Sequence, residues 1–322
     1  MQLAVVRHTP APLDRALVDS ARDFAQASAS PATRRAYSSD WRQFSAWCAA
    51  LGARPLPASP ETVCAYLAHL ANEGRKVATI GRALSSISQA HKAAGLDSPR
   101  ASGVVQRVFR GIRRTLGVSP RRVSPLVTPE LRAVVGGLPD TLAGKRDRAL
   151  LLLGFAGAFR RSELVALNVE DLATVPEGLV ALVRRSKTDQ EGQGKRTGIP
   201  FGPDAGLCPV RAVRAWLDVA GIREGSLFRA VTRDGRVLPW RLSGHSVACI
   251  VKRSLERAGF PSGDYSGHSL RAGLATSAAR ARVARHRIAV QGRWAPGSAI
   301  VDTYIRDVAA FEDNAAAGAL SL

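Results

Sequence analysis

The sequence predicts a mainly α-helical protein with a small antiparallel β-sheet, divided into two domains. Apolar residues recur at helical spacing along most of the 322 residues, while runs 179–185 and 196–201 alternate or are β-branched, as in a β-hairpin. A chain of this length is expected to form about two domains of ~150 residues. The proline-rich segment GVSPRRVSPLVTP has no helical period and makes the best boundary, so residues 117–128 are interpreted as a linker.

The first domain is expected to consist of four short amphipathic helices. Their apolar sets lie within residues 41–51, 63–70, 80–91 and 104–116. Ser59 and Pro60 have the residue types of an N-cap and a first helical position. Residues 1–28 indicate a tail or a weak leading helix, so we place a tail at 1–20 and the helical domain at 21–116.

The second domain is placed at residues 129–322. Residues 148–159 are nearly all apolar and predict a buried helix, and residues 160–167 continue as a polar-then-apolar helical turn. The hairpin follows, with its strands joined by the polar turn SKTDQEGQGK. Further helices are expected over 209–219, 243–258, 269–282 and 285–292. The alanine-rich tail from Val308 is suited to docking on another surface.

The charge balance predicts a polyanionic partner. There are 46 Lys and Arg residues against 26 Asp and Glu, a formal net charge of +20. The excess is mostly arginine, whose guanidinium group binds phosphate through two parallel hydrogen bonds. A GC-rich genome explains part of the arginine bias but not the imbalance of sign. Between Gly74 and Pro129 the only acid is Asp97.

A positively charged wall against a DNA backbone explains this density of charge. For any single arginine, a solvated helix face is the simpler interpretation. The residues that we expect to contact DNA are Arg34, Arg35, Lys76, Arg82, Lys92, Arg107, Arg110, Arg114, Arg121 and Arg122.

Several classes of protein are excluded. No apolar stretch reaches the roughly 18 residues that a membrane span needs, and the N-terminus does not have the pattern of a signal peptide. The cysteines lie far apart without a C-x-x-C pair, so reduced thiols are expected rather than disulfides or a zinc site. We therefore expect a cytoplasmic protein that uses no metal and no cofactor.

Three polar islands in the second half need a chemical explanation. GAFRRSEL at 157–164 places arginines at the end of the buried helix. GHSLR at 267–271 puts a histidine and an arginine on one face of a first helical turn, where the helix dipole also favours an anion. GRW at 292–294 is followed by Tyr304. Each island alone is a weak signal, since His-x-x-Arg occurs by chance in many helices.

Together the islands resemble the tyrosine site-specific recombinases, also called the phage integrase family, and within it the simple Cre-type enzymes. The upstream helices, with TRRAY at 33–37, look like the core-binding domain of that family. The catalytic motifs stand in the order of the family: R-x-S-E-L at 160–164, a hairpin lysine at Lys187, H-x-L-R at 268–271, G-x-W at 292–294, and then Tyr304.

The resemblance implies a role for each of these residues. Arg160 and Arg271 would bind the non-bridging oxygens of the phosphorane, where charge grows in the transition state. Tyr304 would attack phosphorus to give a 3′-phosphotyrosine and a free 5′-hydroxyl. Lys187 would protonate the leaving oxygen, and His268 would assist proton transfer or bind phosphate.

Two further residues would support the site. Trp294 would donate its indole N–H to phosphate and pack the site, and Glu163 would orient neighbouring basic groups. The resemblance also implies a two-domain clamp, with a helical core-binding domain and a mixed α/β catalytic domain around DNA. Strands would be exchanged between two double-stranded sites through a Holliday junction, by a homotetramer on two duplexes. The residues after Tyr304 would form a short helix that docks on a neighbouring protomer. The gene would be bacterial, phage-borne or plasmid-borne and its product nucleoid-associated; the sequence does not indicate whether accessory proteins take part.

Some alternatives stay open. Arg161 replaces Arg160 if the first island is shifted, and Lys195 competes with the hairpin lysine. The gap from Trp294 to Tyr304 is one residue longer than is usual in the family, and a loop at 295–297 could absorb it. Type IB topoisomerase-like activity, hairpin resolution and a non-catalytic DNA-binding regulator are the alternative functions.

Overall fold

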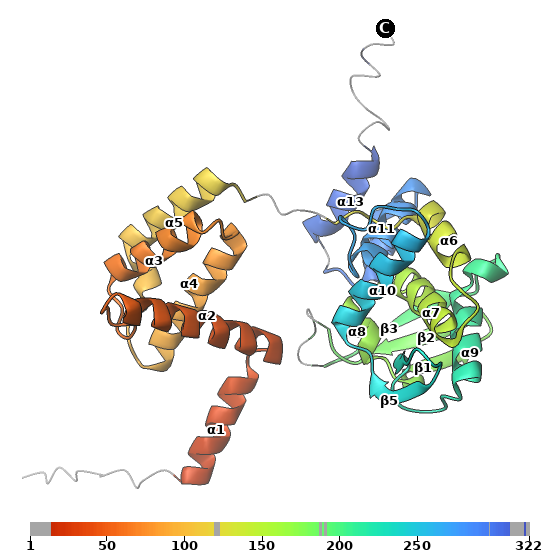
Figure 1. Ribbon diagram of the computed structural model, residues 1–322, viewed down its shortest axis with the longest axis horizontal. Coiled ribbons are helices and arrows are strands. Elements are labelled where there is room, and N and C mark those ends of the chain that lie inside the picture. Colours follow the sequence, from red (N-terminus) through yellow and green to blue (C-terminus); the bar gives the residue numbers. More distant parts are fainter. Residues whose placement is uncertain are drawn as a thin grey trace, which may run out of the picture. The chain divides into compact units, whose positions relative to one another are not determined.

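A computed structural model describes residues 14–118, 123–186, 189, 192–295, 297–309 and 319 of the chain. Its contacts divide the chain into two units, residues 1–120 and 121–322 (Figure 1). The described residues are mainly helical and form two small antiparallel sheets, which confirms the predicted fold class. Within these ranges, we find no helix of the length and apolarity that crossing a lipid bilayer requires.

The first unit is helical throughout. Serine N-caps followed by proline start two of its helices: Ser30 accepts a hydrogen bond from the amide of Thr33, and Ser59 accepts one from Thr62, both at 3.2 Å. The elements are α1 (Arg15–Ala27), α2 (Pro31–Ala50), α3 (Pro60–Asn72), α4 (Val77–Ala93), the 3₁₀ turn η1 (Pro99–Ala101) and α5 (Gly103–Leu116).

Helices α2 to α5 bury one hydrophobic core, which includes Phe44, Leu67, Ile80 and Val105. His91 belongs to the same interior. Its Nδ1 lies 2.8 Å from the carbonyl of Ile87, and its Nε2 accepts the amide of Ala58 at 2.9 Å. These two bonds assign a neutral imidazole with the proton on Nδ1.

Two expectations for this unit need correction. Helix α1 begins at Arg15, so residues 15–20 of the predicted tail are helical; the chain has no glycine or proline there to interrupt them. On α5, Val104 and Leu116 are 41% and 45% exposed. The buried stripe instead runs through Val105, Phe109 and Ile112, at spacings of four and three residues.

The second unit contains a three-stranded sheet, a two-stranded sheet and the remaining helices. The predicted hairpin exists, since β2 pairs antiparallel with β3 and Leu179 lies opposite Ile199. The elements are α6 (Thr128–Gly136), α7 (Leu142–Ala156), α8 (Arg161–Ala166), η2 (Val169–Asp171), β1 (Leu172–Val175), β2 (Gly178–Val183), β3 (Lys195–Pro200), η3 (Ala205–Leu207), α9 (Pro209–Ala220), β4 (Arg229–Val231), β5 (Val237–Arg241), α10 (Gly244–Arg257), α11 (Ser269–Arg280), α12 (Arg285–Gly292) and α13 (Ala299–Ala309).

Three strands were not predicted. Strand β1 extends the hairpin on the far side of β2, and β4 pairs with β5 in a separate ribbon. Strands of three to five residues are too short to show a period of two. A usable signal did exist at Asp234-Gly235, a dipeptide typical of hairpin turns, where Gly235 has a φ of 82°.

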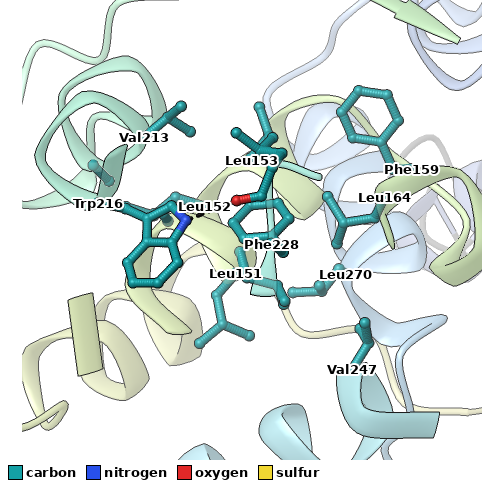
Figure 2. Close-up of a cluster of buried hydrophobic side chains, with 14 of the residues drawn as sticks. Leu151, Leu152, Leu153, Phe159, Leu164, Val213, Trp216, Phe228, Val247 and Leu270 are labelled. Atoms are coloured by element: carbon teal, nitrogen blue, oxygen red, sulfur yellow. Dashed lines mark hydrogen bonds between the residues drawn. The ribbon is translucent and has the colours of Figure 1, made fainter. Parts of the chain in front are cut away.

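Helix α7 lies at the centre of the second unit and packs against α9 and α11 (Figure 1). Leu151 and Leu153 enter a core that also holds Trp216, Phe228 and Leu270 (Figure 2). A side chain at Gly154 would meet Leu270 at 2.8 Å, so α7 and α11 approach closely there. This packing fixes the end of α7 relative to the start of α11, and both ends carry site residues.

Candidate active site

The turn between α7 and α8 positions Arg160. Ala158 has a φ of 45°, which is unusual for a residue other than glycine, and it reverses the chain after α7. A side chain at Gly157 would meet the Phe159 ring at 2.1 Å. The helical turn predicted over residues 160–167 exists as α8 (Arg161–Ala166), but the turn at Ala158 separates it from α7, so it does not continue the buried helix. Arg160 stands immediately before a new helix, which directs it into the site.

The carboxylate of Glu163 is buried and shared between two arginines. Its Oε1 accepts from Nη1 of Arg160 at 2.6 Å, and its Oε2 accepts from the Arg160 amide at 3.0 Å and from Nη2 of Arg293 at 2.9 Å. Burial acts to raise the pKa of Glu163, but the amide and the two guanidinium groups outweigh it and lower the pKa. Glu163 is therefore ionised at neutral pH and holds the arginines in place.

Arg271, on the first turn of α11, is 1% exposed. Its Nη1 donates to the carbonyl of Ala158 at 2.6 Å, and its guanidinium lies 4.0 Å from the centroid of the Trp294 ring. Its Nη2 has no hydrogen-bond partner among the described residues. Burial, together with the charge of Arg160, lowers the pKa of Arg271 to about 9. A buried cation with an unsatisfied donor is suited to bind an anion.

His268 directly precedes α11, and its Nε2 lies 3.4 Å from the hydroxyl of Tyr304 on α13. Desolvation of the ring and the charges of Arg271 and Arg160 lower the pKa of His268. The imidazole is therefore neutral at pH 7 and can accept a phenolic proton.

Trp294 contacts two of the predicted site residues. One contact is the guanidinium of Arg271, and the other is the ring of Tyr304, whose centroid lies 5.9 Å away. A side chain at Gly292 would meet the Trp294 ring at 1.7 Å, so the glycine of the G-x-W motif allows the indole to fold back. The loop expected near residues 295–297 is consistent with the connection between α12 and α13, where Gly297 has a φ of 74°.

Some predicted residues fall elsewhere. Lys187, Arg121 and Arg122 lie outside the described residues, and their roles stay predictions. Lys195, the rival of Lys187, is exposed on β3 opposite Val183, at the end of the strand pair that flanks the turn. Arg161 packs against Gly267, where an added side chain would meet it at 2.3 Å.

The predicted DNA-contact residues of the first unit are accessible. Arg82 differs from the rest, because it makes two hydrogen bonds of 2.7 and 3.0 Å to the buried carboxylate of Asp40. Lys92 and Arg110 line a hollow between α4 and α5. The exposed members are Arg34, Arg35, Lys76, Arg82, Lys92, Arg107, Arg110 and Arg114.

The sequence analysis missed one residue of the site, Arg293. It is 4% exposed and bonds to Glu163, yet in the sequence it is only the variable position of G-x-W. A charge between glycine and tryptophan gives no sign that it is buried. The one available signal was Glu163. A carboxylate that is buried beside the site needs compensating positive charge, and a second arginine such as Arg293 could supply what Arg160 alone does not.

Comparisons with known proteins identify the family. Residues 130–310 match the model of the phage integrase family. The integrase/recombinase xerD homolog of Selenomonas ruminantium is 42% identical over 287 residues, which cover 88% of this chain and 84% of that protein. Recombinase cre of Escherichia phage P1 is 27% identical over 287 residues, with coverages of 83% and 81%.

Solved structures share the fold. A lambda integrase (75–356) dimer bound to a COC′ core site aligns with a TM-score of 0.60 at 18% identity, covering 90% of this chain and 94% of that one. The XerH site-specific recombinase bound to palindromic difH substrate, a post-cleavage complex, aligns with a TM-score of 0.57 at 17% identity, covering 82% and 72%.

The site thus combines the phenol of Tyr304, the neutral imidazole of His268 and two arginines, of which Arg271 has an unpartnered donor. The chain belongs to the phage integrase family. It is a tyrosine site-specific recombinase, which confirms the resemblance and the reaction class predicted from the sequence; the alternative functions are not favoured.

Proposed function

We propose that Tyr304 is the nucleophile and that Arg160 and Arg271 bind the scissile phosphate. The observation that supports this most directly is the 3.4 Å approach of the Tyr304 hydroxyl to His268, beside the unpartnered Nη2 of Arg271. Tyr304 lies on α13, whereas His268 and Arg271 lie at the start of α11, so only the fold brings the tyrosine to the other two.

The arginines stabilise the charge that grows on the phosphorane. Nη2 of Arg271 donates to one non-bridging oxygen, and the nitrogens of Arg160 that Glu163 does not hold donate to another. Because Ala158 and Trp294 already fix Arg271, the donor needs little reorganisation when the transition state forms. Loss of one such donor typically slows the reaction by about a hundredfold to a thousandfold.

Proton transfer completes each step. His268 Nε2 takes the proton of the Tyr304 hydroxyl as the phenolate oxygen attacks phosphorus. The bond from phosphorus to the 5′ oxygen breaks, and Lys187 protonates that oxygen. The 3′-phosphotyrosine retains the phosphoester, so the 5′-hydroxyl of the partner strand can attack it and restore a phosphodiester without an external energy source.

We assign the DNA-binding role of the first domain to residues 21–116 and catalysis to residues 129–322. The basic residues of the first domain hold the duplex through its phosphates. The reaction then takes place in the cytoplasm, on nucleoid, phage or plasmid DNA.

A homotetramer on two duplexes is the assembly that strand exchange requires. An apolar groove in the second unit fits the alanine-rich segment from Val308 of a neighbouring copy, in which Glu312 and Asp313 are the charged residues and the rest is mostly apolar. No charged side chain occurs among the described residues that line the groove, which include Leu131, Phe155, Phe201 and Leu207. We propose that the C-terminal segment of one protomer docks in the groove of the next.

The test uses a pool of DNA duplexes that carry the DNA flanking the gene and are nicked, so that the cleaved fragment diffuses away. The wild-type enzyme is expected to form a covalent complex that survives denaturing electrophoresis, and sequencing the trapped DNA then yields the site. Tyr304→Phe is expected to bind the same DNA without forming the complex, with Tyr37→Phe as the matched control. A Tyr304→Phe enzyme that still forms the complex would overturn the assigned nucleophile.

A further inference from the structure

Arg293 occupies a backbone position that favours glycine. Its φ of 55° lies in the left-handed region, where a side chain crowds the following carbonyl. Arg282, with a φ of 56° at the end of α11, has the same conformation but is exposed to solvent. Arg293 is buried instead, so both its backbone strain and the desolvation of its charge must be compensated by contacts.

The guanidinium of Arg293 connects several separate parts of the site. Nη1 donates to the carbonyl of Gly157 at 2.9 Å and to Oγ1 of Thr197 on β3 at 2.8 Å. Nη2 donates to the carbonyl of Ala158 at 3.2 Å and to Oε2 of Glu163 at 2.9 Å. These bonds tie the end of α12 to the α7–α8 turn, to α8 and to the strand that returns from the catalytic hairpin turn.

One consequence concerns Arg160. An arginine and a carboxylate tend to pair through two parallel hydrogen bonds. If Arg293 did not occupy Oε2, Glu163 could offer both oxygens to the Arg160 guanidinium and hold it away from the DNA. With Arg293 in place, the Arg160 side chain is bound through Nη1 alone, at 2.6 Å.

A second consequence concerns Arg271. The carbonyl of Ala158 accepts hydrogen bonds from Nη1 of Arg271 at 2.6 Å and from Nη2 of Arg293 at 3.2 Å. Arg293 therefore helps to fix the backbone oxygen that sets the direction of Arg271. Both proposed phosphate-binding arginines are oriented by groups that Arg293 also holds.

We propose that Arg293 is a positioning residue for strand cleavage: it divides Glu163 between two guanidinium groups and fixes the Ala158 carbonyl, so that Arg160 and Arg271 both present donors to the scissile phosphate. This inference rests on the proposed roles of Arg160 and Arg271. The bonds described above engage Nη1 and Nη2 of Arg293, and its buried Nε has no hydrogen-bond partner among the described residues.

The test compares Arg293→Gly with Arg282→Gly as the matched control, because both substitutions place glycine in the same left-handed conformation. The nicked duplex recovered with the wild-type enzyme serves as substrate, and single-turnover formation of the covalent complex is measured at saturating protein. We expect Arg293→Gly to be slower by roughly tenfold to a hundredfold, since a misplacement of about 1 Å can cost about a hundredfold. Its affinity for the duplex and the rate of the control should stay within about twofold of wild type.

A second substrate separates positioning from general damage to the fold. A methylphosphonate at the scissile position removes the negative charge that the two arginines hold. On this neutral linkage, Arg293→Gly should form the covalent complex more slowly than wild type by about threefold or less. Adding Glu163→Gln to Arg293→Gly should recover part of the rate on phosphate, because the amide holds Arg160 less tightly than the carboxylate does.

The outcomes are distinct. Equal rates for wild type and Arg293→Gly, or equal losses on the charged and neutral linkages, would overturn the positioning role alone. A wild-type enzyme that forms no covalent complex would overturn the proposed function and, with it, this inference. If Arg293→Gly does not fold, Arg293→Lys keeps the charge but cannot reproduce the set of bonds, and the same comparison of linkages applies.

Discussion

The guanidinium of Arg271 lies 4.0 Å from the centroid of the Trp294 ring, and the ring of Tyr304 packs against the same indole, with its centroid 5.9 Å away. The group proposed to stabilise charge and the group proposed to attack phosphorus thus pack against one side chain. The position of one relative to the other depends on the shape of the indole.

The first prediction concerns this support. Trp294→Ala should lower the free energy of unfolding by about 3–5 kcal/mol and the cleavage rate by about a hundredfold, because it opens a cavity between Arg271 and Tyr304. Trp294→Phe keeps an aromatic surface and should retain more of both. Urea unfolding and single-turnover cleavage measure the two effects. Equal cleavage by the alanine and phenylalanine variants would contradict the support role.

The second prediction concerns pH. Because the pKa of His268 lies below its ordinary value of 6.5, His268 is deprotonated at neutral pH, and the cleavage rate should fall only as pH drops below about 6.5. The charge of Arg161 contributes to that lowering. Arg161→Gln should therefore raise the pKa of His268, so that the acidic limb of the pH–rate profile moves to higher pH. Arg223→Gln changes an exposed side chain and should leave that limb unchanged. A limb that moves to lower pH in Arg161→Gln would rule out His268 as the base.

The third prediction distinguishes two arginines of the first domain. Arg82→Ala leaves the carboxylate of Asp40, whose side chain is 6% exposed, without its partner and should cost about 1–3 kcal/mol of stability. Arg110→Ala, on an exposed helix face, should leave stability unchanged and reduce the salt dependence of DNA binding by about one phosphate contact. Thermal unfolding and binding titrations at several salt concentrations test the pair. A loss of stability in Arg110→Ala together with a reduced salt dependence in Arg82→Ala would contradict this assignment of the two arginines.

The fourth prediction concerns assembly. Leu207→Asp places a charge in the apolar groove and should weaken the four-protomer complex on two duplexes by at least about tenfold, since the carboxylate would lose hydration when the groove is covered. Val219→Asp, at a 48% exposed position on α9, is the control and should assemble normally. Sedimentation of the protein–DNA complex reports the difference. Normal assembly of Leu207→Asp would remove the groove from the interface.

Much of the fold and of the candidate site follows from sequence pattern. Helices with a sustained apolar period were predicted close to their observed bounds, as in 209–219 against Pro209–Ala220. The motif order also suffices to select the residues that the fold brings together, including Arg160, His268 and Tyr304. These short motifs are readable in the sequence because each places a chemical group close to the end of a helix.

Other features depend on tertiary contacts and leave little trace in the sequence. The break between α7 and α8 lies at Ala158, and alanine does not signal a left-handed turn. Arg293 is stable in the interior only because a carboxylate and several carbonyl groups, from segments distant in the sequence, surround it. Local propensity cannot report such compensation.

The bare backbone at Gly292 has a practical consequence. A single methyl group there would collide with the indole that supports both halves of the chemistry, while leaving the basic helices of the first domain untouched. Gly292→Ala should therefore yield a chain that still occupies recombination sites but does not cut them. Mixed with active chains, this variant would act as a dominant inhibitor, because it would occupy recombination sites without cutting them. A single substitution would therefore convert the enzyme into an inhibitor of the unmodified protein.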